Sequence, residues 1–216
     1  MSRNQFSLWR QALTNPSLLM LVGELRCRLR DCSTVLDIGC GDDSPLRFLP
    51  NAHLVGMDGY PPALEKARSR GTHDDYFAGV AKSIRASFPD RRFDACVALD
   101  VIEHLPKDEG WRMLEEMERL ATQRVVIFTP NGFIPQRGHG SDLQEHLSGW
   151  TADEMRQRGY KVHGIYGPKS LRGEYARIKY QPRVFWVLVS ILAHYCHTRS
   201  RPEKSAAIFC VKNLGQ

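Results

Sequence analysis

The chain has 216 residues, of which 25% are charged and 42% hydrophobic, and its net charge is +6. This composition excludes disordered and collagen-like chains and is typical of a globular protein. The positive charge favours acidic partners such as nucleic acid, anionic lipid or phosphorylated metabolites, without choosing among them. The six cysteines form no CxxC pair and the first ten residues lack the apolar core of a secretion signal. We therefore expect a reduced, cytoplasmic protein.

The first predicted element is a helix in the N-terminal segment 1–33. Apolar residues recur there at helical spacing, and Pro16 suits the first turn of that helix. They are Leu18, Leu21, Val22, Leu25 and Leu29.

From Thr34 onward, apolar strands alternate with helices. The predicted strands are 34–39, 52–58, 74–80, 93–100, 124–130, 161–167 and 206–213. The predicted helices between them are 44–50, 61–71, 109–121 and 151–159. Strands of continuous apolar character separated by helices predict an α/β fold with a doubly wound, mostly parallel sheet. Ligands of such sheets bind at the carboxyl ends of the strands.

The connection 168–205 breaks this alternation, because it is too long for a hairpin. Within it, residues 184–193 read VFWVLVSILA and are almost entirely apolar. We expect a buried helix there. The alternative is a helix that borders an apolar substrate site or contacts a membrane surface, with arginines at 183, 199 and 201 flanking it.

The first predicted strand ends on two glycines, in TVLDIGCG. Gly39 and Gly41 let the backbone approach a ligand closely. Asp58 ends the second strand, where a carboxylate can bind both hydroxyls of a ribose. Asp37, just before the turn, repels a pyrophosphate but suits a cationic ligand. S-adenosylmethionine carries a sulfonium, an ammonium and no phosphate, so these residues favour it over NAD.

Four motifs in order make residues 34–167 resemble a class I S-adenosylmethionine-dependent methyltransferase: VLDIGCG, Asp58, ALDVIEHL and VVIFTPN. The resemblance implies one Rossmann-like domain over 1–216, with a seven-stranded sheet whose last strand, 206–213, is antiparallel. Residues 34–167 would form the cofactor-binding core and 168–205 a helical insertion. The implied cofactor is S-adenosylmethionine. The implied cofactor-binding residues are Asp37, Gly39, Cys40, Gly41, Asp58, Gly59, Leu99 and Asp100.

Two positions depart from the family pattern. Asp43 stands where many members carry a third glycine, and Val80 stands where many carry an acid that binds the adenine amine. The adenine is then expected to be held by backbone and apolar contacts.

The stretch LDVIEHLP carries the predicted catalytic side chains. In a helical turn, Asp100, Glu103 and His104 share one face, as a polar cap or as ligands of a divalent ion. His104 is the predicted catalytic residue, because an imidazole can act as a general base near neutral pH. This turn resembles the Glu-x-x-Glu-His motif of the ubiquinone-pathway O-methyltransferases and of the small-RNA 3′-terminal 2′-O-methyltransferases. In this chain, Asp100 stands in place of the first Glu. The RNA enzymes add a histidine four residues before a tryptophan, which His146 matches; whether a metal is bound stays open.

The predicted function is S-adenosylmethionine-dependent O-methylation of a small or lipid-like acceptor. The fourth strand lacks the Asn-Pro-Pro-Tyr type of ending that methyltransferases of base amines use, which counts against a nucleobase amine. Two alternatives remain: an RNA 2′-O-methyltransferase, favoured by the pI near 9.1, and a catalytically silent cofactor-binding protein. The sequence identifies neither the acceptor nor the oligomeric state, and it leaves peripheral membrane contact open.

Overall fold

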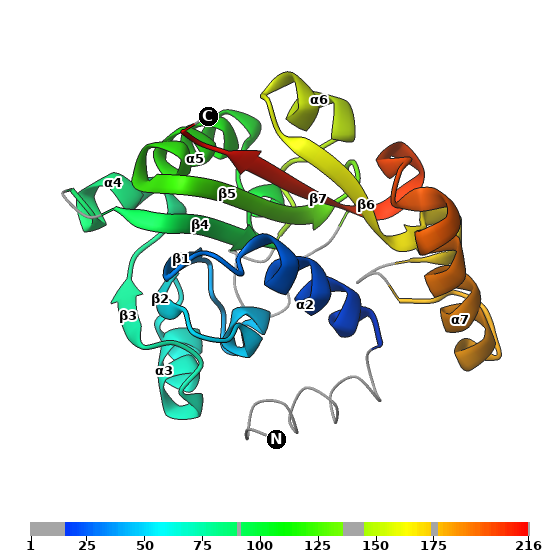
Figure 1. Ribbon diagram of the computed structural model, residues 1–216, viewed down its shortest axis with the longest axis horizontal. Helices are drawn as coiled ribbons and strands as arrows, with labels where there is room; N and C mark the ends of the chain where they lie inside the picture. The colour runs from blue at the N-terminus through cyan, green and yellow to red at the C-terminus, as the bar shows by residue number, and fades with distance from the viewer. Residues whose placement is uncertain (1–15, 90–91, 136–144, 174–176, 216) are drawn as a thin grey trace. The chain divides into compact units, whose positions relative to one another are not determined.

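The structure is a computed structural model that describes residues 16–89, 92–135, 145–173 and 177–215, so residues 1–15 of the predicted N-terminal segment lie outside it. Within these residues, seven strands pair in the order β3-β2-β1-β4-β5-β7-β6 (Figure 1). They are β1 (Thr34–Ile38), β2 (His53–Asp58), β3 (Asp75–Ala78), β4 (Phe93–Leu99), β5 (Ala121–Pro130), β6 (Lys161–Pro168) and β7 (Ser205–Asn213). The β1–β2, β1–β4 and β2–β3 pairs are parallel, and β6 and β7 are antiparallel. The predicted fold class is confirmed.

The helices agree with most of the predicted ranges. They are α2 (Pro16–Arg28), α3 (Pro61–Arg70), α4 (Ile84–Ser87), α5 (Lys107–Leu120), α6 (Ala152–Gln157) and α7 (Arg183–Ala193). Local chemistry explains two of their ends. Gly71, at a φ of 63°, stops α3 in the left-handed region, and Thr151 caps α6 in a box with Glu154. The predicted helix at 44–50 is the short 3₁₀ helix η1 (Pro45–Phe48).

The chain divides into two compact units. The first contains the described residues of Met1–Leu99, Arg112–Val125 and Asn213–Gln216. The interior residues of its central strands are buried, and α3 packs on β2 and β3. Helix α2 packs on η1, where Val22 meets Phe48 and the partly buried Leu18 and Leu19.

The second unit contains Asp100–Trp111 and the described residues of Val126–Lys212. Its core includes the fully buried Trp150, and a Cβ on Gly110 would lie 2.4 Å from the Trp150 ring. The Asn131 side chain joins the end of β5 to the segment before β7, because its amide donates to the carbonyls of Pro202 and Ser205 at 2.9 Å each. The division of one domain into the segments 34–167, 168–205 and 206–213 stays a prediction.

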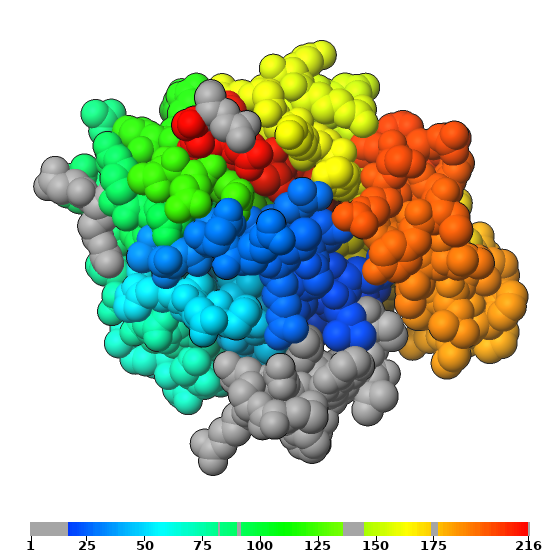
Figure 2. Space-filling view, viewed as in Figure 1, coloured from blue at the N-terminus to red at the C-terminus, as the bar shows by residue number. Residues whose placement is uncertain are grey.

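Helix α7 corrects one expectation. Ser190 is its only buried residue, so the helix does not fill the core as its apolar composition predicted. The segment that contains α7 forms part of the surface in Figure 2, where it is orange. Among the described helices, none combines the length and apolar character needed to cross a membrane.

Candidate active site

The sheet register brings three predicted cofactor-binding positions to one edge. Ile38, the last residue of β1, pairs with Met57 of β2 and with Ala98 of β4. The next residues along these three strands are Gly39, Asp58 and Leu99. Since parallel strands end at the same edge, these residues start the loops in which ligands of this fold bind.

The glycine turn has the backbone conformation that its sequence predicts. Gly39 and Gly41 have φ angles of 69° and 59°, in the left-handed region that residues with a Cβ rarely adopt. The amides of Gly39 and Cys40 donate to the Met57 carbonyl at 2.7 and 3.1 Å, which anchors the turn to β2. A Cβ built on Gly41 would meet nothing within 4 Å, so the backbone there borders open space that a ligand can approach.

Asp58 is hydrogen-bonded both to this turn and to the loop that follows β2. Its Oδ2 accepts a hydrogen bond from the Gly41 amide at 2.8 Å, and its Oδ1 accepts one from the Tyr60 amide at 2.7 Å. Each carboxylate oxygen keeps a further acceptor site, and the side chain is only half-buried. Asp58 can therefore bind ribose hydroxyls while it fixes the glycine turn.

Gly59 and Val80 form the adjoining surface. A Cβ on Gly59 would lie 2.6 Å from Val80 Cγ1, so only glycine allows this approach. Val80 is itself exposed, and an exposed apolar side chain at this place suits the flat face of an adenine. The position that lacks the expected acid thus presents an apolar side chain.

Asp37 lies inside the protein instead of facing the turn. Its Oδ2 accepts hydrogen bonds from Ser44 Oγ at 2.5 Å and from His73 Nε2 at 3.0 Å. Both Asp37 and His73 are buried, and Thr72 Oγ1 lies 2.9 Å from the other ring nitrogen of His73. Asp37 therefore holds the loop after β1 in place. His73 was missed in the sequence, because 36 residues separate the two partners and no motif links them.

The two aspartates that follow the turn are paired with arginines. Asp42 forms an ion pair with Arg70 at 3.1 Å, and Asp43 forms one with Arg47. Asp43 is thus paired with a residue of η1.

Three further predicted residues take different positions. Cys40 is buried, and this burial, with the Asp37 charge nearby, raises the pKa of its thiol. Only the backbone of Cys40 is therefore expected to contact a ligand. Leu99 is half-buried at the end of β4. Asp100 follows with a φ of 53° and an exposed side chain, and its amide donates to the Phe128 carbonyl at 2.9 Å.

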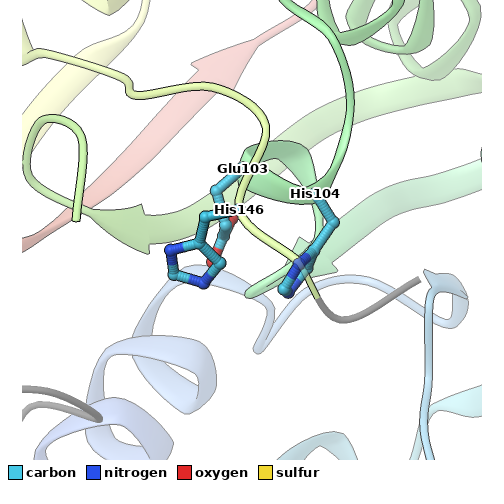
Figure 3. Close-up of side chains that lie close together, drawn as sticks. All are labelled: Glu103, His104 and His146. Carbon is cyan, nitrogen blue, oxygen red and sulfur yellow. The ribbon is translucent and has the colours of Figure 1, made fainter. Parts of the chain in front are cut away.

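Glu103, His104 and His146 come together in the second unit. One ligand atom from each lies within 4.8 Å of the others, and Figure 3 shows the three side chains converging. Glu103 and His104 lie on the 3₁₀ helix η3 (Ile102–His104), whereas His146 comes from the segment before Trp150. Asp100 is not a member of this group, because it precedes η3 in a left-handed conformation and not in a continuous helical turn.

Hydrogen bonds to backbone carbonyls hold the rings of the two histidines. His104 Nδ1 lies 3.0 Å from the Glu145 carbonyl, and His146 Nδ1 lies 2.7 Å from the Ile134 carbonyl. A carbonyl only accepts, so each Nδ1 donates in these hydrogen bonds, and in a neutral imidazole Nε2 is then the nitrogen that has a lone pair. This is the arrangement that metal-binding histidines adopt.

Glu103 completes the group with a buried carboxylate. Its Oε2 accepts a hydrogen bond from Thr129 Oγ1 at 2.9 Å, and its buried Oε1 receives no N–H or hydroxyl donor. The Asp100 carboxyl group lies within hydrogen-bonding reach of the Glu103 carboxyl group. Burial, together with the charge of Asp100, raises the pKa of Glu103 well above its usual range. Two carboxyl groups this close cannot both stay ionised at low cost, and either a shared proton or a bound cation would relieve their repulsion. The donor set, one carboxylate and two imidazoles, suits a divalent transition metal or Mg²⁺.

The electrostatics of His104 fit either of two roles. Burial, with His146 nearby, lowers the pKa of His104 below its usual value. The imidazole is therefore neutral at pH 7, as both a general base and a metal ligand must be.

In comparison with known proteins, residues 36–128 match a family model described as a methyltransferase domain. Probable tRNA methyltransferase 9B of Homo sapiens is 36% identical over 120 residues, 55% of this chain and 26% of that protein. Sterol 24-C-methyltransferase erg-4 of Neurospora crassa is 33% identical over 84 residues, 35% of this chain and 22% of that protein. The chain spans about a quarter of the length of the curated relatives it matches.

A solved structure supports the fold over a greater length. The plantazolicin methyltransferase BpumL in complex with SAH superposes with a TM-score of 0.58 and covers 100% of this chain and 91% of its own. The sequence identity is 12%, so this likeness concerns the fold alone.

Proposed function

We propose that this chain, which contains a class I S-adenosylmethionine-dependent methyltransferase domain, transfers the methyl group to a hydroxyl oxygen. The observation that carries the oxygen acceptor is the convergence of Glu103, His104 and His146, in which both Nδ1 atoms contact carbonyls and the buried Glu103 Oε1 receives no N–H or hydroxyl donor. Methylation of a nucleophilic nitrogen or carbanion needs little from such a group, whereas a hydroxyl must lose its proton.

The cofactor assignment is supported by the glycine turn and by Asp58. The turn allows close backbone approach, Asp58 offers acceptors to the ribose, and Val80 offers an apolar surface to the adenine. The SAH bound in a protein of the same fold is consistent with this assignment. Asp37, His73 and Ser44 act indirectly, by holding the loop that contacts the cofactor.

The same residues would hold a divalent cation through Glu103, His104 Nε2 and His146 Nε2. A bound cation lowers the pKa of a coordinated hydroxyl and orients its oxygen. Thr129 fixes the Glu103 carboxylate, and the Glu145 and Ile134 carbonyls fix the two imidazoles. The acceptor oxygen forms a bond to the methyl carbon, the carbon–sulfur bond breaks, and its electron pair stays on sulfur as S-adenosylhomocysteine. The hydroxyl proton leaves to solvent or to a base.

The proposed acceptor is a small or lipid-like molecule, as the likeness to ubiquinone-pathway O-methyltransferases suggests. A sterol methyltransferase among the relatives is consistent with an apolar acceptor. The RNA 2′-O-methyltransferase stands as the second candidate, because His146 lies in the metal-ligating group and a probable tRNA methyltransferase is among the relatives.

Labelled S-adenosylmethionine incubated with the protein and separate lipid, small-molecule and RNA extracts tests these alternatives. We expect label in the lipid or small-molecule pool, loss of activity with a chelator, and restoration by Mn²⁺ or Mg²⁺. His146→Asn should require far more metal for activity, whereas the exposed His53→Asn should behave as the wild type. Label in RNA alone selects the second candidate. Cofactor binding without label in any pool indicates a silent protein, and full activity of His146→Asn in chelator contradicts the metal site.

A further inference from the structure

Helix α7 continues into the π-helical turn η7 (His194–Thr198). An ordinary surface helix buries apolar residues and exposes polar ones, whereas this element buries polar residues and exposes apolar ones. Their buried face is polar: Ser190, His194 and Thr198, spaced four residues apart, are 0%, 2% and 0% exposed. Their outward face is apolar. Its residues and exposed fractions are Val184 75%, Phe185 56%, Leu188 61%, Leu192 65% and Tyr195 61%.

Specific contacts fix this orientation. Ser190 Oγ donates to the Tyr166 carbonyl at 3.0 Å and lies 3.2 Å from Arg172 Nη2. A Cβ on Gly167 would lie 2.4 Å from the Ser190 carbonyl oxygen, so the helix backbone sits directly on a glycine whose φ is 75°. Rolling the helix to bury its leucines would break the hydrogen bonds of Ser190. The contacts of Ser190 and Gly167 therefore keep the apolar face of the helix directed outward.

The exposed face is continuous and carries aromatic residues at one end. Exposed residues recur at 184, 188, 192 and 195, which is the spacing of one side of a helix. Phe185 and Trp186 lie 5.3 Å apart between ring centroids, and the exposed Tyr180 lies 5.2 Å from Trp186. Contiguous exposed apolar surface of this kind marks an interaction site, and aromatic residues of this kind favour the membrane–water boundary.

The basic residues near α7 in the sequence favour an anionic partner. Residues 177–202 contain five arginines and lysines and no aspartate or glutamate. They are Arg177, Lys179, Arg183, Arg199 and Arg201. A second copy of this surface would bring like charges together, whereas anionic lipid headgroups would attract each of them. The helix has 11 residues, or about 16 Å, against the ~30 Å of a bilayer core, so it can lie in the interface but cannot span it.

We propose that α7 and η7 form a membrane-binding surface that lies in the headgroup region of an anionic bilayer. The five apolar side chains enter the boundary of the acyl chains, and the flanking basic side chains bind the lipid phosphates. This inference concerns binding alone and does not depend on the reaction that the protein catalyses.

Co-sedimentation of the full chain with vesicles tests the proposal. We expect binding to vesicles of phosphatidylcholine mixed with phosphatidylglycerol, weaker binding to pure phosphatidylcholine, and a decrease at high salt. The double variant Leu188→Gln/Leu192→Gln should lose at least about ten-fold in partition coefficient, because two apolar anchors are removed. Arg183→Glu/Arg201→Glu should lose about ten-fold or more at low salt.

Matched variants separate these effects from unfolding and from net charge. Lys66→Glu/Arg85→Glu reverses two exposed charges on α3 and α4 and should bind nearly as the wild type does. Phe133→Gln replaces an exposed apolar side chain outside α7 and should also bind. Because Leu188 and Leu192 are exposed, their variant should keep the wild-type melting temperature. The proposal is overturned if the wild type binds neither vesicle, if both vesicles bind equally, or if the leucine variant binds as the wild type does. It is also overturned if the wild type forms a dimer that the leucine variant dissociates, without vesicle binding.

Discussion

At the scale of single residues, Asp58 fixes the glycine turn and is the proposed acceptor for the ribose hydroxyls. We expect Asp58→Ala to weaken S-adenosylmethionine binding by roughly one to two orders of magnitude, because hydrogen bonds to a charged group contribute about 1.5–3 kcal/mol. The change also removes the acceptor of the Gly41 amide. Calorimetric titration measures the affinity, and Asp153→Ala, an exposed carboxylate on α6, is the control. Unchanged affinity would contradict the ribose assignment.

His73 tests whether the loop after β1 depends on its internal support. His73→Phe should lower the free energy of unfolding by about 1–3 kcal/mol, since it removes a hydrogen bond from the buried Asp37 carboxylate. Cofactor affinity should fall as well, although His73 does not contact the cofactor in this proposal. Urea unfolding and calorimetric titration measure both effects. The exposed His53→Phe should stay within about 0.5 kcal/mol of the wild type. Equal stability of the two variants would refute the supporting role of Asp37–His73.

At the scale of elements, the sequence predicted the strands well, because parallel strands buried on both faces are continuous apolar runs ended by glycine, proline or aspartate. It failed at α7, since an apolar run does not say which face a helix presents. The signal was present in the polar residues: Ser190, His194 and Thr198 recur every four residues. In the site, Gly39 and Asp58 were predicted because they follow strands, and His146 by a family motif. His73 was not, because its partner is set by the packing of distant segments.

The buried His194 makes the α7–η7 element sensitive to acid. Burial first, and then Arg199 and Arg172, lower the pKa of His194 to about 4, against about 6.5 in an unfolded chain. Between these two pKa values, His194 is protonated in the unfolded chain and neutral in the folded chain. The contribution of neutral His194 to the free energy of unfolding is therefore complete above pH ~6.5 and is lost as the pH falls toward 4. At pH 5 the loss is about 2 kcal/mol. Urea unfolding at pH 7 and pH 5 should show it in the wild type, and His194→Gln should show a pH difference smaller by that amount. The same pH difference in both proteins would contradict this assignment.

At the scale of the whole molecule, two surfaces have been inferred on independent grounds: a methyl-transfer site that suits a hydroxyl, and a helix that suits a membrane. A lipid-like acceptor would connect them, because a protein held at the bilayer meets an acceptor dissolved there at a high local concentration. Methylation of an RNA acceptor would not become faster when vesicles are present. The dependence of activity on the physical state of the acceptor therefore distinguishes the two candidate functions.

This connection predicts the behaviour of Leu188→Gln/Leu192→Gln toward one labelled lipid extract in two forms. With the extract in anionic vesicles, the variant should show an apparent KM raised about ten-fold, because fewer molecules reside at the membrane, and a kcat close to that of the wild type. The same extract is then given in neutral detergent micelles, at acceptor concentrations that do not saturate the wild type. The difference in apparent KM between the variant and the wild type should be much smaller there, since no anionic surface recruits either protein. Glu103→Gln should lose kcat in both forms, because it acts at the proposed site and not at the membrane. A variant that loses kcat equally in vesicles and micelles would show that α7 contributes to the reaction itself, and it would contradict a purely membrane-binding role.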